Sequence, residues 1–311
     1  MNSTLENAIK EEQKFFNYLN NNRRLSNNIP VEFDYDYSPL IFDFERYTSK
    51  IMGKKSVDNY LSVINEINGG KVIDVCCGSG WVSLLGAKNG ANVSGYDISD
   101  VGINNAIEMK NKNLDHIMKV NGSLDYFNQS VHDIPFLDNK ESVNLYVGWS
   151  AFHHLDEMEV FFEKMKFSLK PGGYIISIDD IGSNKLNRII TWLLKFLLPI
   201  KGLSYFDKIS SLRKYWDKLV QPEVEWHTPM EEFVGKHENA AQKIEDILQN
   251  EYEIVYNYRY CSFLHYFVYD IAGPDWFRKA VFNILWPIDR FCGWLGICKG
   301  NLRFILAKKH L

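Results

Sequence analysis

The sequence has few cysteines, little net charge and no long uninterrupted apolar run. The five cysteines in 311 residues form no repeated C-x-x-C pattern, which indicates reduced thiols in a cytoplasmic protein and no zinc framework. A net charge of −4 provides no basic field for nucleic acid. Charges break the apolar stretch 188–200 well short of the ~20 residues that span a bilayer, and the N-terminus lacks a signal-peptide pattern. We therefore expect a cytoplasmic protein with no transmembrane segment and no nucleic-acid partner.

The sequence does contain an alternation of short β-rich runs and helical segments. A hydrophobic content of 46% is ordinary for a folded chain, and the length fits about two domains or one α/β domain with additions. Strands are predicted at 71–75, 91–97, 128–131, 142–149, 174–179, 253–259 and 302–307, with a turn at 170–173. Helices between successive strands favour a parallel, doubly wound sheet.

This pattern divides the chain into four predicted parts. They are an N-terminal helical cap segment (1–54), a core (55–182), a helical substrate-cap insert (183–250) and the last two strands with an aromatic helical insertion (251–311). For the aromatic helices at 186–200 and 274–298, core or dimer packing is the default interpretation. The alternatives are a lid over a lipophilic substrate and a helix lying on a membrane surface.

The most informative segment runs from Val72 to Ser83. A strand ends there, Gly78 and Gly80 make a turn, and a helix begins. A helix N-terminus presents unpaired N–H groups, and glycine lets a ligand approach the backbone closely. Asp97 ends the next strand about twenty residues on, where a carboxylate can accept hydrogen bonds from a ribose diol. The segment predicts a nucleoside-binding crevice at the carboxyl ends of the strands.

Two residues of this segment disfavour a dinucleotide ligand. Ser83 stands where a dinucleotide-binding turn requires a third glycine or alanine. Asp74 would face a pyrophosphate unfavourably, whereas it can orient the ammonium group of an amino acid. A ligand with a zwitterionic tail is therefore favoured. An NAD-type Rossmann oxidoreductase stays as an alternative, as does a catalytically degenerate module that binds cofactor or a partner.

Five segments in order resemble motifs of the class I S-adenosylmethionine (SAM)-dependent methyltransferases. They are 72–80, Gly95-Tyr-Asp-Ile-Ser, Val131-His-Asp-Ile-Pro-Phe, 143–155 and Leu169-Lys-Pro-Gly-Gly-Tyr-Ile-Ile-Ser. The resemblance covers residues 70–180. It implies a Rossmann-like seven-stranded sheet with helical cap or lid insertions, SAM as cofactor and S-adenosylhomocysteine (SAH) as product. It also implies methyl transfer to oxygen or nitrogen of a small or amphiphilic metabolite such as a natural product, lipid or sugar.

The resemblance implies cofactor-binding roles for eleven residues. Those at the methionine part are Asp74, Gly78, Ser79 and Gly80. Those at the ribose are Asp97 and Ile98. Those at the adenine are His132, Asp133 and Ile134, and those beneath the sulfonium are Trp149 and Ser150.

The predicted methyl transfer also calls for a side chain that acts as a general base. Methyl transfer to oxygen or nitrogen needs positioning and removal of a proton. His153 and His154 follow the fourth strand where substrate would enter, although bracing of the loop is the more common role there. His227 is a weaker candidate. No cluster of acids predicts a metal, and the sequence identifies neither the acceptor nor the oligomeric state; peripheral membrane contact stays open.

Overall fold

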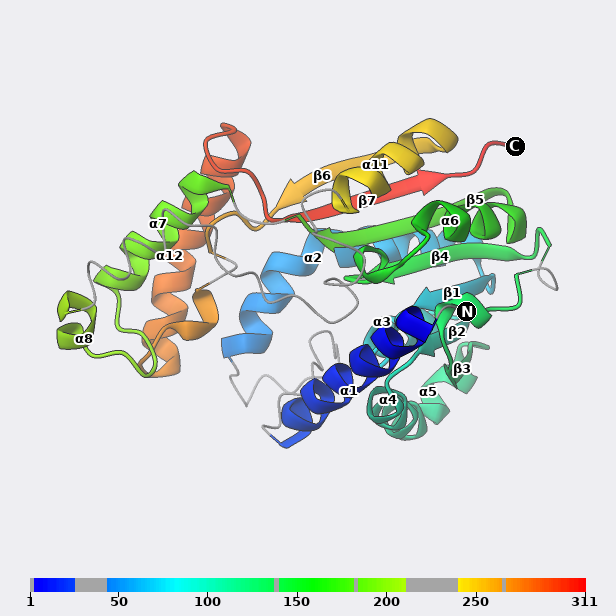
Figure 1. Cartoon of the computed structure of the whole chain (residues 1–311), viewed down its shortest axis with the longest axis horizontal. Helices are drawn as coiled ribbons and strands as arrows, with labels where there is room; N and C mark the ends of the chain where they lie inside the picture. The colour runs from blue at the N-terminus through cyan, green and yellow to red at the C-terminus, as the bar shows by residue number, and fades with distance from the viewer. Residues whose placement is uncertain (1–2, 26–43, 137–139, 182–183, 211–239, 265–266) are drawn as a thin grey trace.

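The computed structural model describes residues 3–25, 44–136, 140–181, 184–210, 240–264 and 267–311. In these residues seven strands form one sheet in the order β3-β2-β1-β4-β5-β7-β6 (Figure 1). Their bounds are β1 Lys71–Val75, β2 Asn92–Asp97, β3 Ser123–Asn128, β4 Val143–Trp149, β5 Leu169–Asp180, β6 Glu253–Tyr260 and β7 Leu302–Lys308. Strands β1 to β5 run parallel, and β7 runs antiparallel to β5 and β6. The expected seven-stranded, doubly wound α/β sheet is confirmed.

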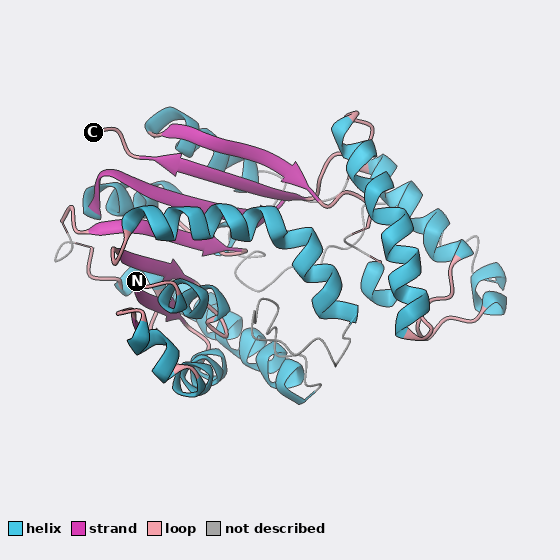
Figure 2. Ribbon diagram, turned by 180° about the vertical axis from the view of Figure 1, so that it is seen from behind, coloured by secondary structure: helices cyan, strands magenta, loops and turns pink. Residues whose placement is uncertain are grey.

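Helices cover both faces of this sheet (Figure 2). Alternate residues of β1 point to opposite faces, so that Val72 joins one apolar core and Ile73 the other. The first core lies under α2 (Phe44–Ile67) and α3 (Trp81–Lys88). The second core lies under α6 (Met158–Ser168) and α11 (Ala240–Glu251), although α11 falls within the predicted substrate-cap insert.

The turns after β1 and β2 lead into helices at the carboxyl ends of the strands. Helix α4 (Asp100–Lys112) begins after Ser99, whose hydroxyl accepts a hydrogen bond from the Gly102 N–H, as an N-cap should. Helix α5 (Leu114–Lys119) then returns the chain to β3. The parallel connections therefore gather the loops of the predicted cofactor site at one edge of the sheet.

The predicted third strand at 128–131 is wrong. Strand β3 is Ser123–Asn128 and pairs along its length with β2, from Asn92 with Ser123 to Asp97 with Asn128. Residues Val131–Asp133 form a short 3-10 turn instead, with the Ser130 hydroxyl accepting from the His132 N–H at 3.3 Å. β3 is an edge strand with one fully buried apolar residue, Leu124, so its alternation is weak in the sequence.

The predicted turn at 170–173 lies within the bounds of β5. Pairing with β4 passes from Val143 opposite Leu169 to Leu145 opposite Tyr174, so these four residues bulge out of that ladder. Gly172 has φ +72°, a left-handed conformation that the Pro-Gly-Gly sequence accommodates. The prediction of a turn that precedes a strand starting at 174 is therefore wrong, because these residues form a bulge inside a strand that starts at Leu169.

A third apolar core lies beyond the end of the sheet. It joins the start of α2 to α7 (Lys185–Leu197), α12 (Asp275–Trp294) and the segments 261–264 and 267–271 (Figure 1). The buried Asp289 carboxylate of α12 accepts from the N–H groups of Ser262 and Leu264, each at 3.0 Å. We call α7, α8 (Tyr205–Ser210) and α12 the helical unit. Within the described ranges, none of the helices has the length and apolar character needed to cross a bilayer.

Candidate functional site

The two glycines of the turn between β1 and α3 serve different purposes. Gly80 has φ +76°, and a Cβ there would lie 2.3 Å from the Tyr126 hydroxyl and 2.7 Å from the Ala106 Cβ, so glycine is required for packing. Gly78 has φ +53°, and a Cβ there would meet nothing within 4 Å. The turn therefore borders open space at Gly78, and no side chain caps the following helix. This is the geometry that a ligand approaching the backbone needs.

Asp97 is fixed at the end of β2 and is only 8% exposed. One carboxylate oxygen accepts from the Gly78 N–H at 2.8 Å, and the other accepts from the Ser99 N–H at 2.7 Å. Burial raises the pKa of Asp97, although these two hydrogen bonds act in the opposite direction. A carboxylate has about four acceptor positions, so Asp97 keeps acceptor capacity for a diol.

Asp74 is buried in β1, directly before the turn. Its carboxylate accepts from the Ser83 hydroxyl at 2.5 Å, so Ser83 holds Asp74 instead of making close helix–strand contact as a third glycine would. Burial raises the pKa of Asp74 to about 7, and the negative charge of Asp97 adds to this shift. The sequence-predicted pair of acids thus flanks the glycine turn, and a cation beside Asp74 would favour its ionised form.

The residues predicted at the adenine are divided between the surface and the core. Asp133 is exposed on the 3-10 turn, whereas Ile134 is buried among the apolar residues beneath α6. His132 Nε2 lies 2.5 Å from a carboxylate oxygen of Asp156, and this contact lowers the pKa of Asp156. Asp156, which lies in the loop after β4, is not among the sequence-predicted site residues.

The residues predicted beneath the sulfonium follow the end of β4. The Trp149 ring meets the Trp81 ring edge-on with 4.6 Å between centroids, which joins the end of β4 to the first residue of α3. Ser150 is exposed with φ +54°, and its N–H donates to the Ile178 carbonyl at 2.6 Å. The remaining two predicted residues, Ser79 and Ile98, are half-buried at the same edge.

The two candidate bases have different carboxylate partners. His153 Nδ1 lies 2.7 Å from a carboxylate oxygen of Asp179 in β5, whose other oxygen accepts from the Ser177 hydroxyl at 2.5 Å. His154 Nδ1 lies 3.2 Å from Glu12 Oε1, and the two imidazole centroids are 4.1 Å apart. A carboxylate at Nδ1 selects the neutral tautomer protonated there and leaves Nε2 as a proton acceptor. His227 lies outside the described residues.

Helix α1 (Ser3–Leu25) contributes site residues that the sequence did not reveal. Its Asn17 side-chain oxygen accepts from the Ser99 hydroxyl at 2.8 Å, which places α1 at the start of α4 (Figure 1). Glu12 is 3% exposed and contacts His154, and the Phe16 ring lies edge-on to the same imidazole at 5.5 Å. α1 therefore covers part of the carboxyl edge of the sheet.

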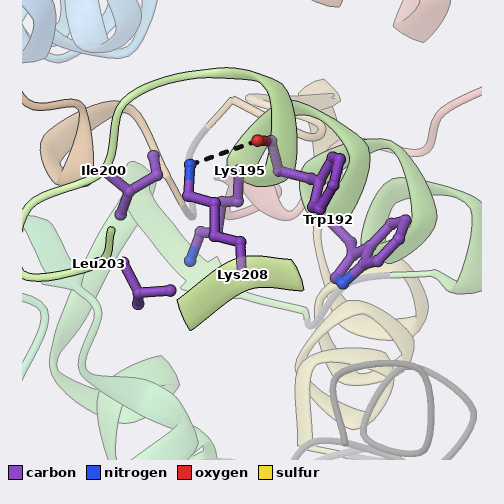
Figure 3. A pocket seen from close by; sticks show the side chains of 6 residues that line it. Trp192, Lys195, Ile200, Leu203 and Lys208 are labelled. Atoms are coloured by element: carbon purple, nitrogen blue, oxygen red, sulfur yellow. Dashed lines mark hydrogen bonds between the residues drawn. The ribbon is translucent and has the colours of Figure 1, made fainter. Parts of the chain in front are cut away.

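A pocket in the helical unit is separate from this edge. It is lined by Trp192, Lys195, Phe196, Ile200, Leu203 and Lys208 (Figure 3). The buried Lys208 ammonium donates to the Phe196 carbonyl at 3.3 Å and also to the Leu198 carbonyl. None of the sequence-predicted site residues lines it. Among the described residues, no group of three or more His, Cys, Asp or Glu side chains is placed to hold a metal ion.

Comparison with known proteins finds methyltransferases. Residues 73–177 match the model of a methyltransferase domain family. A demethylmenaquinone methyltransferase of Staphylococcus epidermidis is 28% identical over 205 residues, covering 63% of this chain and 73% of the relative. A ubiquinone biosynthesis O-methyltransferase of Nitrobacter winogradskyi is 26% identical over 170 residues, covering 54% and 58%. The solved magnesium protoporphyrin IX methyltransferase of Synechocystis with bound SAH is 14% identical, with a TM-score of 0.46 and coverage of 89% and 93%.

The domain match covers the segment in which the glycine turn, Asp97 and β4 lie. The strand order of the sheet, with its antiparallel last strand, provides the scaffold around that segment. Residues 73–177 are a methyltransferase domain, and at the level of this domain the predicted class I SAM-dependent methyltransferase with SAM as cofactor is confirmed.

Proposed function

We propose that this methyltransferase acts on an oxygen or nitrogen atom of a small or amphiphilic acceptor, with His153 as general base. The observation that carries the proposal is the 2.7 Å pair between His153 Nδ1 and Asp179 at the carboxyl edge of the sheet. Both side chains are nearly buried, at 9% and 3% exposure, so the carboxylate interacts strongly with the ring. SAM supplies an activated methyl group when bound, and the chain needs only to position the acceptor and take its proton.

For the cofactor, we propose that the carboxyl-edge residues act as the resemblance implies. Asp97 accepts from the ribose hydroxyls, the turn at Gly78 receives the methionine part, and Asp74 attracts the ammonium group. Open space at Gly78 and the fixed Asp97 carboxylate support this arrangement. Asp133, exposed on its turn, is the proposed acceptor for the adenine amine.

For the acceptor, the names of two relatives favour a quinone-like ring compound. One is a demethylmenaquinone methyltransferase and the other a ubiquinone biosynthesis O-methyltransferase. A ring hydroxyl is acidic enough for a histidine to deprotonate as the methyl group transfers. In this mechanism His153 Nε2 takes the proton, and Asp179 stabilises the imidazolium that results.

The experiment has two stages. Calorimetric titration with SAH is expected to show binding, and titration with NAD is expected to show none. Radiolabelled SAM is then incubated with hydroxyl, amine and carbon acceptors, both water-soluble and lipophilic. Label transferred to a hydroxyl or amine acceptor supports the proposal. Transfer only to carbon acceptors contradicts the atom proposed, and SAH binding with no transfer supports a degenerate module.

A further inference from the structure

Helix α12 carries an apolar stripe on the side that faces away from its own core. Its inner side includes Phe282 and Asp289, both at most 1% exposed. On the opposite side, Ile284, Ile288, Phe291 and Leu295 follow one another at steps of four, three and four residues, which places them on a single face. Ile284 is 65% exposed and Phe291 is 55% exposed. Apolar residues on both sides of a helix indicate that the outer side has a partner.

The outer stripe is extended by exposed aromatic and aliphatic side chains. Trp294, at the end of α12, is 78% exposed, and its ring lies 5.9 Å from that of Phe291. Elsewhere in the helical unit Leu193, Leu197, Tyr205, Phe206, Ile209 and Trp276 are also exposed. Trp and Tyr are the aromatic residues that favour the boundary between water and lipid.

The charge of this region differs in sign from that of the whole chain. Segments 185–210 and 271–300 contain nine Lys and Arg against three Asp, a net charge of +6, whereas the chain carries −4. Lys208, Arg278 and Asp289 are buried, so seven basic and two acidic residues remain, a balance of +5. Exposed Arg290 and Lys299 lie close in sequence to the stripe. Exposed apolar residues with basic neighbours are complementary to an anionic bilayer surface.

We propose that the outer face of α12 docks the protein peripherally on an anionic lipid bilayer, with Ile284, Phe291 and Trp294 inserted among the headgroups. Arg290 and Lys299 contact lipid phosphates in this arrangement. A second copy of the chain is a poorer partner, because a two-fold contact through this face would bring two basic surfaces together. α12 lies between β6 and β7 in the chain, and the helical unit to which it belongs lies at the end of the sheet to which the β4 and β5 arrows point (Figure 1).

Vesicle co-sedimentation of the whole chain tests this proposal without SAM or acceptor, so its result is independent of the proposed reaction. We expect binding to phosphatidylglycerol vesicles at low salt, a blue shift of tryptophan fluorescence, weaker binding at high salt, and little binding to phosphatidylcholine vesicles. The double variant Ile284→Ser/Phe291→Ser is expected to reduce partitioning by about tenfold or more. The charge variant Arg290→Glu is expected to weaken binding to phosphatidylglycerol.

Met118→Ser is the matched control, since Met118 on α5 is 70% exposed and far from the helical unit (Figure 1). It should bind vesicles as the unchanged chain does, and equal thermal unfolding of all variants excludes misfolding. Absence of binding to phosphatidylglycerol, or equal binding by the double variant, overturns the proposal. A dimer in sedimentation that Ile284→Ser/Phe291→Ser dissociates would also overturn it, because the face would then be a subunit interface.

Discussion

The Gly78 N–H donates a 2.8 Å hydrogen bond to Asp97, nineteen residues further along the chain. This contact ties the turn after β1 to the end of β2, its neighbour in the sheet. The second oxygen of Asp97 accepts from Ser99, so both bonds fix the plane of the carboxylate. A group oriented in advance loses less freedom when a ligand binds, which makes Asp97 the sharpest test of the cofactor site.

Replacing Asp97 by alanine is expected to weaken SAH binding by roughly tenfold or more. The ribose would lose one or two charge-assisted hydrogen bonds, each worth ~1.5–3 kcal/mol. Calorimetric titration measures the change, and Asp125→Ala, which removes an exposed acid paired with Lys110, is the matched control. Unchanged affinity in a folded Asp97→Ala protein would refute the proposed contact with the ribose.

The two glycines of the turn give a matched pair of alanine variants. Gly80→Ala places a Cβ 2.7 Å from the Ala106 Cβ, so we expect a loss of stability of about 1–3 kcal/mol. Gly78→Ala meets no protein atom within 4 Å, so we expect a smaller loss, about 1 kcal/mol, from its left-handed backbone. Its added methyl group would instead occupy space proposed for the methionine part. Chemical denaturation and SAH titration separate the two effects; equal SAH affinity for Gly78→Ala and the unchanged chain would contradict the proposal.

The sequence predicted the strands whose apolar runs are buried. β1, β2 and β4 are of this kind, and their predicted positions are correct within one residue. β3 was misplaced because an edge strand needs few apolar residues, and its pairing with β2 is a long-range contact. β6, the other edge strand, is predicted within one residue because aromatic and aliphatic residues alternate with polar ones along it, so the weak alternation of β3 explains its misplacement.

The candidate site shows the same division. Asp74, Gly78 and Asp97 could be named because they follow one another in a local motif. Glu12 and Asn17 could not, since only the tertiary packing of α1 brings them to the carboxyl edge. Asp179 could have been found by the rule that identified Asp97, because it too lies near the carboxyl end of a parallel strand.

Asp74 should make stability depend on pH. Its pKa is raised to about 7 in the fold, against about 3.9 in an unfolded chain, so the folded state binds the proton more tightly. The contribution is most favourable below about pH 4 and is lost as pH rises through 7. The Asp74→Asn variant lacks this titration, so its stability relative to the unchanged chain should increase between about pH 5 and pH 8. Denaturation at several pH values measures this trend, with exposed Asp115→Asn as control; a constant difference for Asp74→Asn would contradict it.

SAH binding should release a proton if the ammonium group lies beside Asp74. The added positive charge would lower the pKa of the Asp74 carboxyl group from about 7. SAH affinity should therefore rise with pH over the range in which Asp74 is protonated in the free protein, and should stop rising above about pH 7. Calorimetry near pH 6 in two buffers of different ionisation enthalpy counts the protons released. Asp74→Asn should remove the release. Equal proton release by the variant would show that another group is responsible.

His153 and Asp179 should act as a unit in the methyl-transfer step. Without the carboxylate, His153 would no longer be held in the tautomer that carries its proton on Nδ1, so Asp179→Asn and His153→Ala should each lower kcat by ~10²-fold. The double variant should lose little more than either single variant, because both changes remove the same function.

Single-turnover rates across pH, with the acceptor identified by the radiolabel screen, measure the effect. SAH affinity serves as the control for folding and should stay within about twofold, since neither residue is proposed to contact the cofactor. Losses that multiply in the double variant would show that the two residues act independently. A His153→Ala rate within about twofold of the unchanged chain would leave positioning as the only contribution of this pair.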